Sequence, residues 1–196
     1  MAIKPILFNT EMVRAILDGR KDATRRIVKG FIPDDAVWGY TAFTPKGYIS
    51  CRGTFADGYG EKFFKLPCEP GDILYVRETW KKAPNRYYYY EDWQRNDIAD
   101  VTKWKPSIHM PKEAARIWLK VTDVRVERLQ EITSEQICRE GVEVEYPHVL
   151  NGEEKRYAFS TLWNNTIKKS DINRYGWDAN PWVWVIEFER CEKPEK

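Results

Sequence analysis

The stretch Gly19-Arg20-Lys21-Asp22-Ala23-Thr24-Arg25-Arg26 places four cations around one threonine, directly after a predicted short helix. An apolar face predicts that helix, made by Met12, Val13, Ile16 and Leu17. Gly19 can end the helix in the left-handed conformation. Because the free carbonyls at a helix C-terminus attract cations, a solvated basic loop would by itself explain the charge of this stretch.

A second stretch, Pro70-Gly71-Asp72-Ile73-Leu74-Tyr75-Val76-Arg77-Glu78-Thr79-Trp80, combines a turn with a strand. Both faces of the strand are apolar at first, which predicts a central strand. Glu78 comes where the strand leaves the core. A lysine, a threonine hydroxyl and a glutamate form an acid–base and nucleophile set if the fold brings Lys21, Thr24 and Glu78 together.

The rest of the chain contains more predicted strands than helices. Apolar runs predict strands at residues 6–8, 117–129 and 182–189, with alternate residues of the last one on opposite faces. A capping box of Thr133 and Gln136 begins a short helix, and a second helix carries Phe159, Leu162 and Trp163. Because βαβ spacing is mostly missing, the pattern favours one α+β domain, a small mixed or antiparallel barrel with peripheral helices.

Composition limits the function classes. The chain has 196 residues with 32% charged and 42% apolar residues, which indicates a soluble globular domain. The net charge of +2 argues against bulk electrostatic coating of nucleic acid but leaves room for a local basic patch. Nine tryptophans and eleven tyrosines can fill a core or stack on bases.

We do not expect a metalloprotein, a membrane protein or a secreted protein. No C-x-x-C pair occurs, so a zinc site and other metal cofactors are not predicted. Scattered cysteines without a signal-peptide pattern indicate reduced thiols and a cytoplasmic location. No apolar run approaches the roughly 18 residues of a membrane span. The cysteines and histidines behind this reasoning are Cys51, Cys68, Cys138, Cys191, His109 and His148.

The two quoted stretches, in this order, resemble the ASCH domain family, whose fold is a PUA-like β-barrel. The family pattern G-x-K-x-x-T-x-R is met by Gly19, Lys21, Thr24 and Arg26, and its P-G-D turn before a glutamate-bearing strand by Pro70-Gly71-Asp72 and Glu78. Residues 129–141 and 182–188 also fit. The family core is shorter, so the resemblance implies one domain over 1–196 with two insertions, 31–66 and 81–111, as in longer ASCH proteins of phage and prophage genomes.

The resemblance also implies two kinds of function. Some ASCH members are amidohydrolases that remove the acetyl group from N(4)-acetylcytidine, and others are implicated in RNA binding or cleavage. In the amidohydrolase type Lys21 would be the base and Thr24 the nucleophile, with no cofactor. Glu78 would protonate the leaving amino group or position the water that frees the acyl-threonine. Lys21 would then need a pKa several units below its ordinary value of about 10.4, through burial or the cations Arg25, Arg26 and Arg77.

Binding roles remain open beside the catalytic ones. Arg25, Arg26 and Arg77 suit a phosphate, although ordinary surface charge explains them equally well. Trp80 would wall the pocket or pack in the core. The leading hypothesis is a metal-independent amide hydrolase for an acylated nucleobase or nucleoside. The alternative is a module that binds RNA or a modified nucleotide; a ribonuclease lacks a convincing histidine pair.

Overall fold

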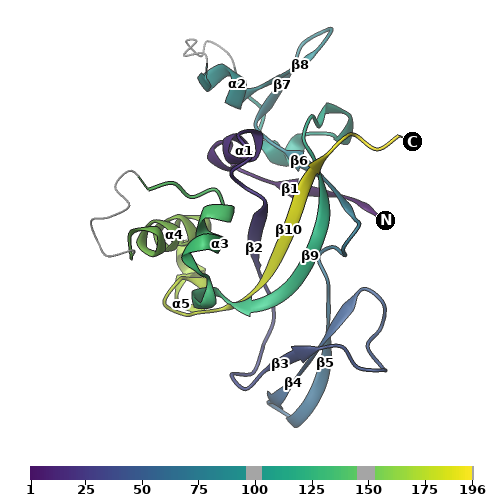
Figure 1. Cartoon of the computed structure of the whole chain (residues 1–196), viewed down its shortest axis with the longest axis vertical. Coiled ribbons are helices and arrows are strands. Elements are labelled where there is room, and N and C mark those ends of the chain that lie inside the picture. The colour runs from purple at the N-terminus through teal and green to yellow at the C-terminus, as the bar shows by residue number, and fades with distance from the viewer. Residues whose placement is uncertain (96–102, 145–152, 196) are drawn as a thin grey trace.

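The structure, a computed structural model, describes residues 1–95, 103–144 and 153–195 (Figure 1). The strands are β1 Ile3–Leu7, β2 Ala23–Ile27, β3 Val37–Gly39, β4 Tyr48–Phe55, β5 Gly58–Lys65, β6 Ile73–Arg77, β7 Trp80–Lys82, β8 Tyr87–Tyr89, β9 Trp118–Arg128 and β10 Trp182–Cys191. The α-helices are α1 Thr10–Leu17, α2 Tyr90–Arg95, α3 Ser134–Arg139, α4 Glu153–Thr166 and α5 Ile172–Tyr175. Short 3-10 turns join several of them, among them Lys169–Asp171. The expected α+β class is confirmed.

A five-stranded mixed sheet in the order β1-β6-β9-β10-β2 forms the centre. β1 runs parallel to β6, and the other described pairs are antiparallel. β6 lies inside the sheet, as its two apolar faces predict. The described residues show no strand pairing between the outer strands β1 and β2, so the expected barrel is not closed by a hydrogen-bonded ladder. One side chain spans the two edges, where Arg26 Nη2 donates 2.9 Å to the Leu7 carbonyl.

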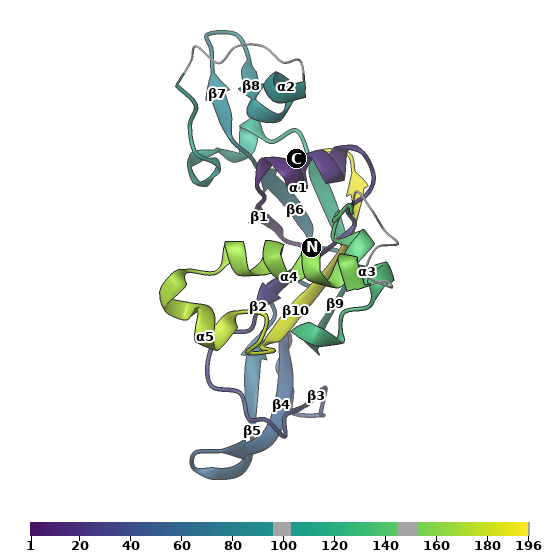
Figure 2. The ribbon, with the colours of Figure 1, turned by 90° about the vertical axis from the view of Figure 1, so that its left-hand side faces the viewer.

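β10 is buried on both faces, and its alternating sequence explains how. Trp184, Ile186 and Phe188 join the main core between the sheet and α1. Val183 and Val185 face the opposite way, into a second core that α3 and α4 cover. The predicted alternation of this strand is therefore confirmed. Val183 and Val185 pack against α4, which lies over the sheet near β2 (Figure 2).

Two smaller sheets lie outside the central one. The first is within the stretch 31–66 predicted as an insertion, and the second begins at Trp80, one residue before the predicted insertion 81–111. β3-β4-β5 forms one and β7-β8 the other, and Figure 1 shows them at opposite ends of the molecule. A turn at residues 56–57 joins β4 to β5. β3 ends at Gly39, and Thr41 and Thr44 then bond to each other in a turn. Residues 96–102 of the second stretch lie outside the described ranges.

Local signals around the basic stretch act mostly as predicted. Asn9 caps α1 by accepting from the Met12 amide at 2.9 Å, and Gly19 follows the helix with φ 75°. Thr133 and Gln136 form the predicted capping box of α3. The basic stretch itself is not a loop, because residues 23–27 form β2 and pair with β10. In the described ranges, no helix combines the length and apolar character that crossing a membrane requires.

Candidate functional site

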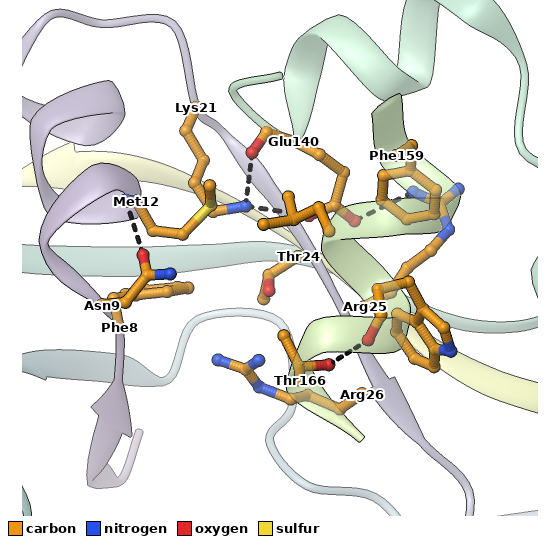
Figure 3. A pocket seen from close by; sticks show the side chains of 12 residues that line it. Phe8, Asn9, Met12, Lys21, Thr24, Arg25, Arg26, Glu140, Phe159 and Thr166 are labelled. Carbon is orange, nitrogen blue, oxygen red and sulfur yellow. Dashed lines mark hydrogen bonds and ion pairs between the residues drawn. The ribbon is translucent and has the colours of Figure 1, made fainter. Parts of the chain in front are cut away.

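A small cavity of about 70 Å³ lies where α1, β2 and α4 meet (Figure 3). α1 supplies one wall, the first residues of β2 the floor, and α4 the cover. The lining is a ring of polar groups beside apolar and aromatic side chains: Phe8, Asn9, Met12, Lys21, Thr24, Arg25, Arg26, Glu140, Phe159, Leu162, Trp163 and Thr166. The cavity therefore contains three of the four family-motif positions of the first quoted stretch.

Lys21 is buried and fully engaged by oxygen atoms. Its Nζ donates to the carbonyls of Ala23 (2.7 Å) and Glu140 (2.8 Å) and to the Glu140 carboxylate (2.8 Å). Burial lowers the pKa of Lys21, the Glu140 carboxylate opposes this, and Arg26 and Arg25 lower the pKa further. Three acceptors need all three N–H bonds of an ammonium group, which leaves no lone pair to take a proton from Thr24.

The backbone around Glu140 and Gly141 holds this arrangement. Glu140 forms an isolated antiparallel bridge with Lys21. Gly141 has φ 83°, and a Cβ there would lie 2.6 Å from the Ala15 Cβ and 3.1 Å from the Lys21 Cβ. A glycine is required because helix α1 and the Lys21 side chain both approach the backbone. Asp22 is half-exposed outside the cavity lining, where its carboxylate accepts a hydrogen bond from Arg139 at 2.8 Å.

Arg25 is also a structural cation. Its guanidinium is buried and donates to Glu140 (3.1 Å), Glu127 (3.2 Å) and Gln136 (3.1 Å). Its Nε has no hydrogen-bond partner in the described parts of the chain. Glu140 thus compensates two buried cations at once, Lys21 and Arg25. A role of Arg25 in holding a phosphate would require this network to open.

Arg26 differs from its neighbour, because alternate residues of β2 point to opposite sides. Its side chain is exposed, bonds to the Leu7 carbonyl and lies 5.3 Å from the centre of the Phe8 ring. Within the described ranges it has no carboxylate partner at ion-pair distance. Arg26 is therefore a cation at the cavity whose charge the protein does not neutralise directly.

Two uncharged polar groups complete the cavity. The Thr24 hydroxyl has no hydrogen-bond partner among the described residues, although Thr24 is buried at 3% exposure. The Asn9 amide oxygen is used for the α1 cap, and Figure 3 shows its nitrogen turned toward the cavity. Both groups can bond to a ligand without breaking an existing contact of the same atom.

Glu78 does not join Lys21 and Thr24 at the cavity. Glu78 is buried, and the Arg116 guanidinium donates a 2.9 Å hydrogen bond to each of its carboxylate oxygens. Burial raises the pKa of Glu78, and Arg116 opposes the shift. A second carboxylate, Asp92, holds the same arginine at 2.7 Å. The predicted convergence of lysine, threonine and glutamate is therefore not formed, because Arg116, which sequence reasoning did not single out, binds the acid elsewhere.

The other two predicted binding residues also lie away from the cavity lining. Arg77 Nε donates to the Met110 carbonyl at 2.7 Å. Trp80 is buried at 4% in a third apolar cluster with Met110 and Trp118, which corresponds to the core-packing alternative. Residues 107–118 pack against the end of β6. This non-local packing determines where the side chains of Arg77 and Trp80 lie.

Sequence reasoning missed Glu140, Asn9 and the aromatic residues of the cover, Phe159 and Trp163. One sequence feature could have drawn attention to Glu140: it is an acidic residue directly before a glycine, at the end of a helix with a predicted capping box. Among the described residues, no group of three or more histidine, cysteine or acidic side chains is placed to hold a metal ion. His148 lies outside the described ranges.

Comparisons with known proteins give limited similarity. No family model matches the chain, and no solved structure matches it. A stretch of 100 residues is 27% identical to oxysterol-binding protein homolog 7 of Saccharomyces cerevisiae. The match covers 48% of this chain and 22% of that protein, so the chain spans only about a fifth of the length of this curated relative. At this identity and coverage, the similarity does not show membership of a family.

Proposed function

We propose that the cavity binds one nucleobase of an RNA or a modified nucleotide, and that the chain is a large ASCH-type protein whose open sheet is a PUA-like barrel. One observation carries the proposal: Lys21 and Arg25 are held by the carboxylates of Glu140 and Glu127, while Arg26, Thr24 and other polar groups remain available. A site in which the titratable groups are locked and the hydrogen-bonding groups are free is better suited to recognition than to proton transfer.

The available groups complement the edge and face of a base. The Asn9 amide nitrogen and the Arg26 guanidinium donate hydrogen bonds, as carbonyl and ring-nitrogen acceptors of a base require. The Thr24 hydroxyl donates or accepts. Phe8 and Trp163 supply aromatic surface, and aromatic side chains stack on unpaired bases. Arg26 also suits the phosphate of a nucleotide.

The cavity must enlarge to admit a base. Its volume of about 70 Å³ is well below the roughly 300–1,000 Å³ of typical ligand pockets. A neighbouring cavity of about 300 Å³ shares two lining residues with it, Met12 and Leu162. Methionine is flexible and adapts to irregular spaces. Rotation of these two side chains would join the cavities without moving the Lys21 network.

Hydrolysis of an acylated nucleobase is the second candidate, favoured by the Thr24 hydroxyl beside the Lys21 ammonium at the cavity. Thr24 would attack the acyl carbon, the amine would leave with a proton, and water would release the acid from the threonine ester. The ammonium would stabilise the negative oxygen of the intermediate. A base for Thr24 is the missing part, because Glu140 is engaged by two cations and Glu78 by Arg116.

Binding and turnover can be measured on the same variants. Calorimetry with cytidine, N(4)-acetylcytidine and nucleoside monophosphates should show binding to the wild type. Thr24→Val keeps the shape but removes the hydroxyl, and Arg26→Gln removes the free cation; each should weaken binding about 5–100-fold, as expected for a lost hydrogen bond or charged contact. Arg86→Gln, on an exposed arginine of the β7–β8 hairpin, is the matched control and should bind normally.

The outcomes separate the two candidates. Binding without release of acetate from N(4)-acetylcytidine supports recognition. Acetate release that Thr24→Val abolishes, in a protein with an unchanged melting temperature, supports the hydrolase. Absence of binding for every nucleoside and nucleotide would refute the proposal, and so would equal affinities for wild type, Thr24→Val and Arg26→Gln.

A further inference from the structure

We infer that a second subsite for single-stranded RNA lies at the far end of β2, in a separate cavity of about 170 Å³. The inference rests on the proposed function, because it extends the ligand from one base to a short strand. The cavity is formed by the chain that leaves β2, the start of β10 and the connection around α5. Its lining includes two arginines and three aromatic residues: Phe31, Arg128, Arg174, Tyr175 and Trp182.

Both arginines lie on aromatic rings. The guanidinium carbon of Arg128 is 4.4 Å from the centre of the Trp182 ring, and that of Arg174 is 5.0 Å from the centre of the Tyr175 ring. An arginine that lies on an aromatic ring offers a planar, charged surface on which a base can stack, and its N–H groups reach phosphate oxygens. Phe31, 63% exposed, adds an aromatic group at the same cavity.

The positive charge of these arginines is poorly compensated. Arg174 donates to the Gly30 carbonyl at 3.2 Å and has no carboxylate partner among the described residues. Arg128 donates to the Asn180 carbonyl at 3.1 Å, and its acidic neighbour Asp34 is 3.5 Å away with a fully exposed side chain. The buried indole N–H of Trp182 has no acceptor within the described ranges. Stacking for stability alone would not require one cation that lacks a carboxylate partner in the described ranges and a second whose carboxylate partner is fully exposed.

β2 connects the two cavities. Arg26 lies at the first cavity, and Val28 and Gly30 line the second. At about 3.3 Å per residue, Arg26 and Gly30 are at most roughly 13 Å apart. With about 3.4 Å between stacked nucleotides, that distance corresponds to a strand of about four nucleotides. β2 is an outer strand of the sheet, and within the described ranges no further strand pairs with its outer edge.

Further exposed cations are close to the second cavity in sequence. Lys29 stands between its lining residues Val28 and Gly30, and Lys168 and Lys169 precede α5. Acidic residues are present but fewer there, with Asp171 and Asp178 in the same connection. Net charge over the whole chain is close to neutral, so cations near the second cavity are the feature that would guide a phosphate backbone. Single-stranded RNA is the occupant that combines phosphates with bases able to stack.

The experiment compares a nucleoside with a short strand. Fluorescence anisotropy with a labelled single-stranded RNA of about six nucleotides measures the longer ligand, and calorimetry with cytidine measures the first cavity. Arg174→Ala should weaken RNA binding about 5–50-fold and reduce the salt slope by about 0.7, the value for one lost phosphate contact on a single strand. It should leave cytidine binding unchanged. Arg174→Lys should restore the salt slope but not the full affinity.

Arg86→Ala is the matched control, because Arg86 also lies on a tyrosine ring, 4.4 Å from the centre of Tyr88, but on the distant β7–β8 hairpin. It should bind RNA like the wild type. Equal RNA affinity for wild type and Arg174→Ala, with cytidine bound normally, would overturn the second subsite and leave the proposed function intact. Loss of affinity in both Arg174→Ala and Arg86→Ala would overturn it as well. Failure of the wild type to bind either ligand would overturn both proposals.

Discussion

Glu140 holds Lys21 at two points, since the lysine ammonium donates 2.8 Å hydrogen bonds to both the main-chain carbonyl and the carboxylate of Glu140. The two residues are 119 positions apart in the chain. The same carboxylate accepts from Arg25 at 3.1 Å. One acid therefore compensates two buried cations under the candidate binding cavity, and removal of that acid would leave both charges without their closest counter-charge.

Replacement of Glu140 should destabilise the protein strongly. Glu140→Gln keeps the shape but removes the negative charge, and breaking a buried ion pair costs about 3–5 kcal/mol of unfolding free energy. Urea denaturation measures the loss. Glu143→Gln is the control, because Glu143 pairs with Arg20 at the surface and is 72% exposed, so its loss should be less than about 1 kcal/mol. Equal small losses in both variants would contradict a central role for Glu140.

Glu78 should be important for stability but not for binding at the cavity. Its carboxylate pairs with Arg116 through two hydrogen bonds, and it does not line the cavity. We expect Glu78→Gln to lower the unfolding free energy by about 2–4 kcal/mol. At a temperature where the variant is folded, its affinity for cytidine should equal that of the wild type. A selective loss of binding or turnover in Glu78→Gln would instead support the catalytic role that the family resemblance implies.

Asp72 should make stability depend on acid pH. Burial alone would raise its pKa, but hydrogen bonds from the Ala2 amide, from Lys4 and from the Glu69 amide bring the pKa below its ordinary value. A lowered folded-state pKa means that the unfolded chain binds the proton first as pH falls. The stabilisation is thus complete above about pH 4 and is lost as pH decreases through the lower folded-state pKa.

The corresponding variant is Asp72→Asn. It should cost about 1–3 kcal/mol at neutral pH, since the carboxylate accepts several hydrogen bonds that an amide cannot accept together. The stability difference between the variant and the wild type should shrink in acid, as measured by denaturation at a series of pH values. A difference that stays constant down to the acid limit of folding would show that the charge of Asp72 contributes nothing.

Gly141→Ala should disturb both stability and the cavity. The positive φ of 83° costs an alanine about 1–2 kcal/mol, and its Cβ would also clash with Ala15 and press on Lys21. Gly19→Ala separates these effects, because Gly19 has a similar φ of 75° but open space where a Cβ would lie. We expect the Gly141 variant to lose more stability than the Gly19 variant and to bind cytidine more weakly. Equal losses would mean that the close contact does not matter.

Local sequence signals determined the elements of this protein. The alternation of residues 182–189 predicted a strand whose side chains point to two opposite faces, because side chains in a strand have a period of two. The structure places both faces in apolar cores. The Thr133 capping box was equally informative, because its partner Gln136 is three residues away. The two apolar faces of the strand at 73–77 were informative too, because an apolar face can pack against any apolar surface. The α+β class follows from these elements.

The site depended on contacts that no local pattern records. Four residues of the basic stretch line the cavity, but only the tertiary structure determined which acid they meet, because Glu78 and Glu140 are both buried and each pairs with the cation that the fold brings nearest. Desolvation makes an unpaired buried carboxylate costly, so Glu78 pairs with Arg116, and Glu140 pairs with Lys21 and Arg25. The sequence by itself determined which residues carry charge; the packing of segments more than 100 positions apart decided which charges meet.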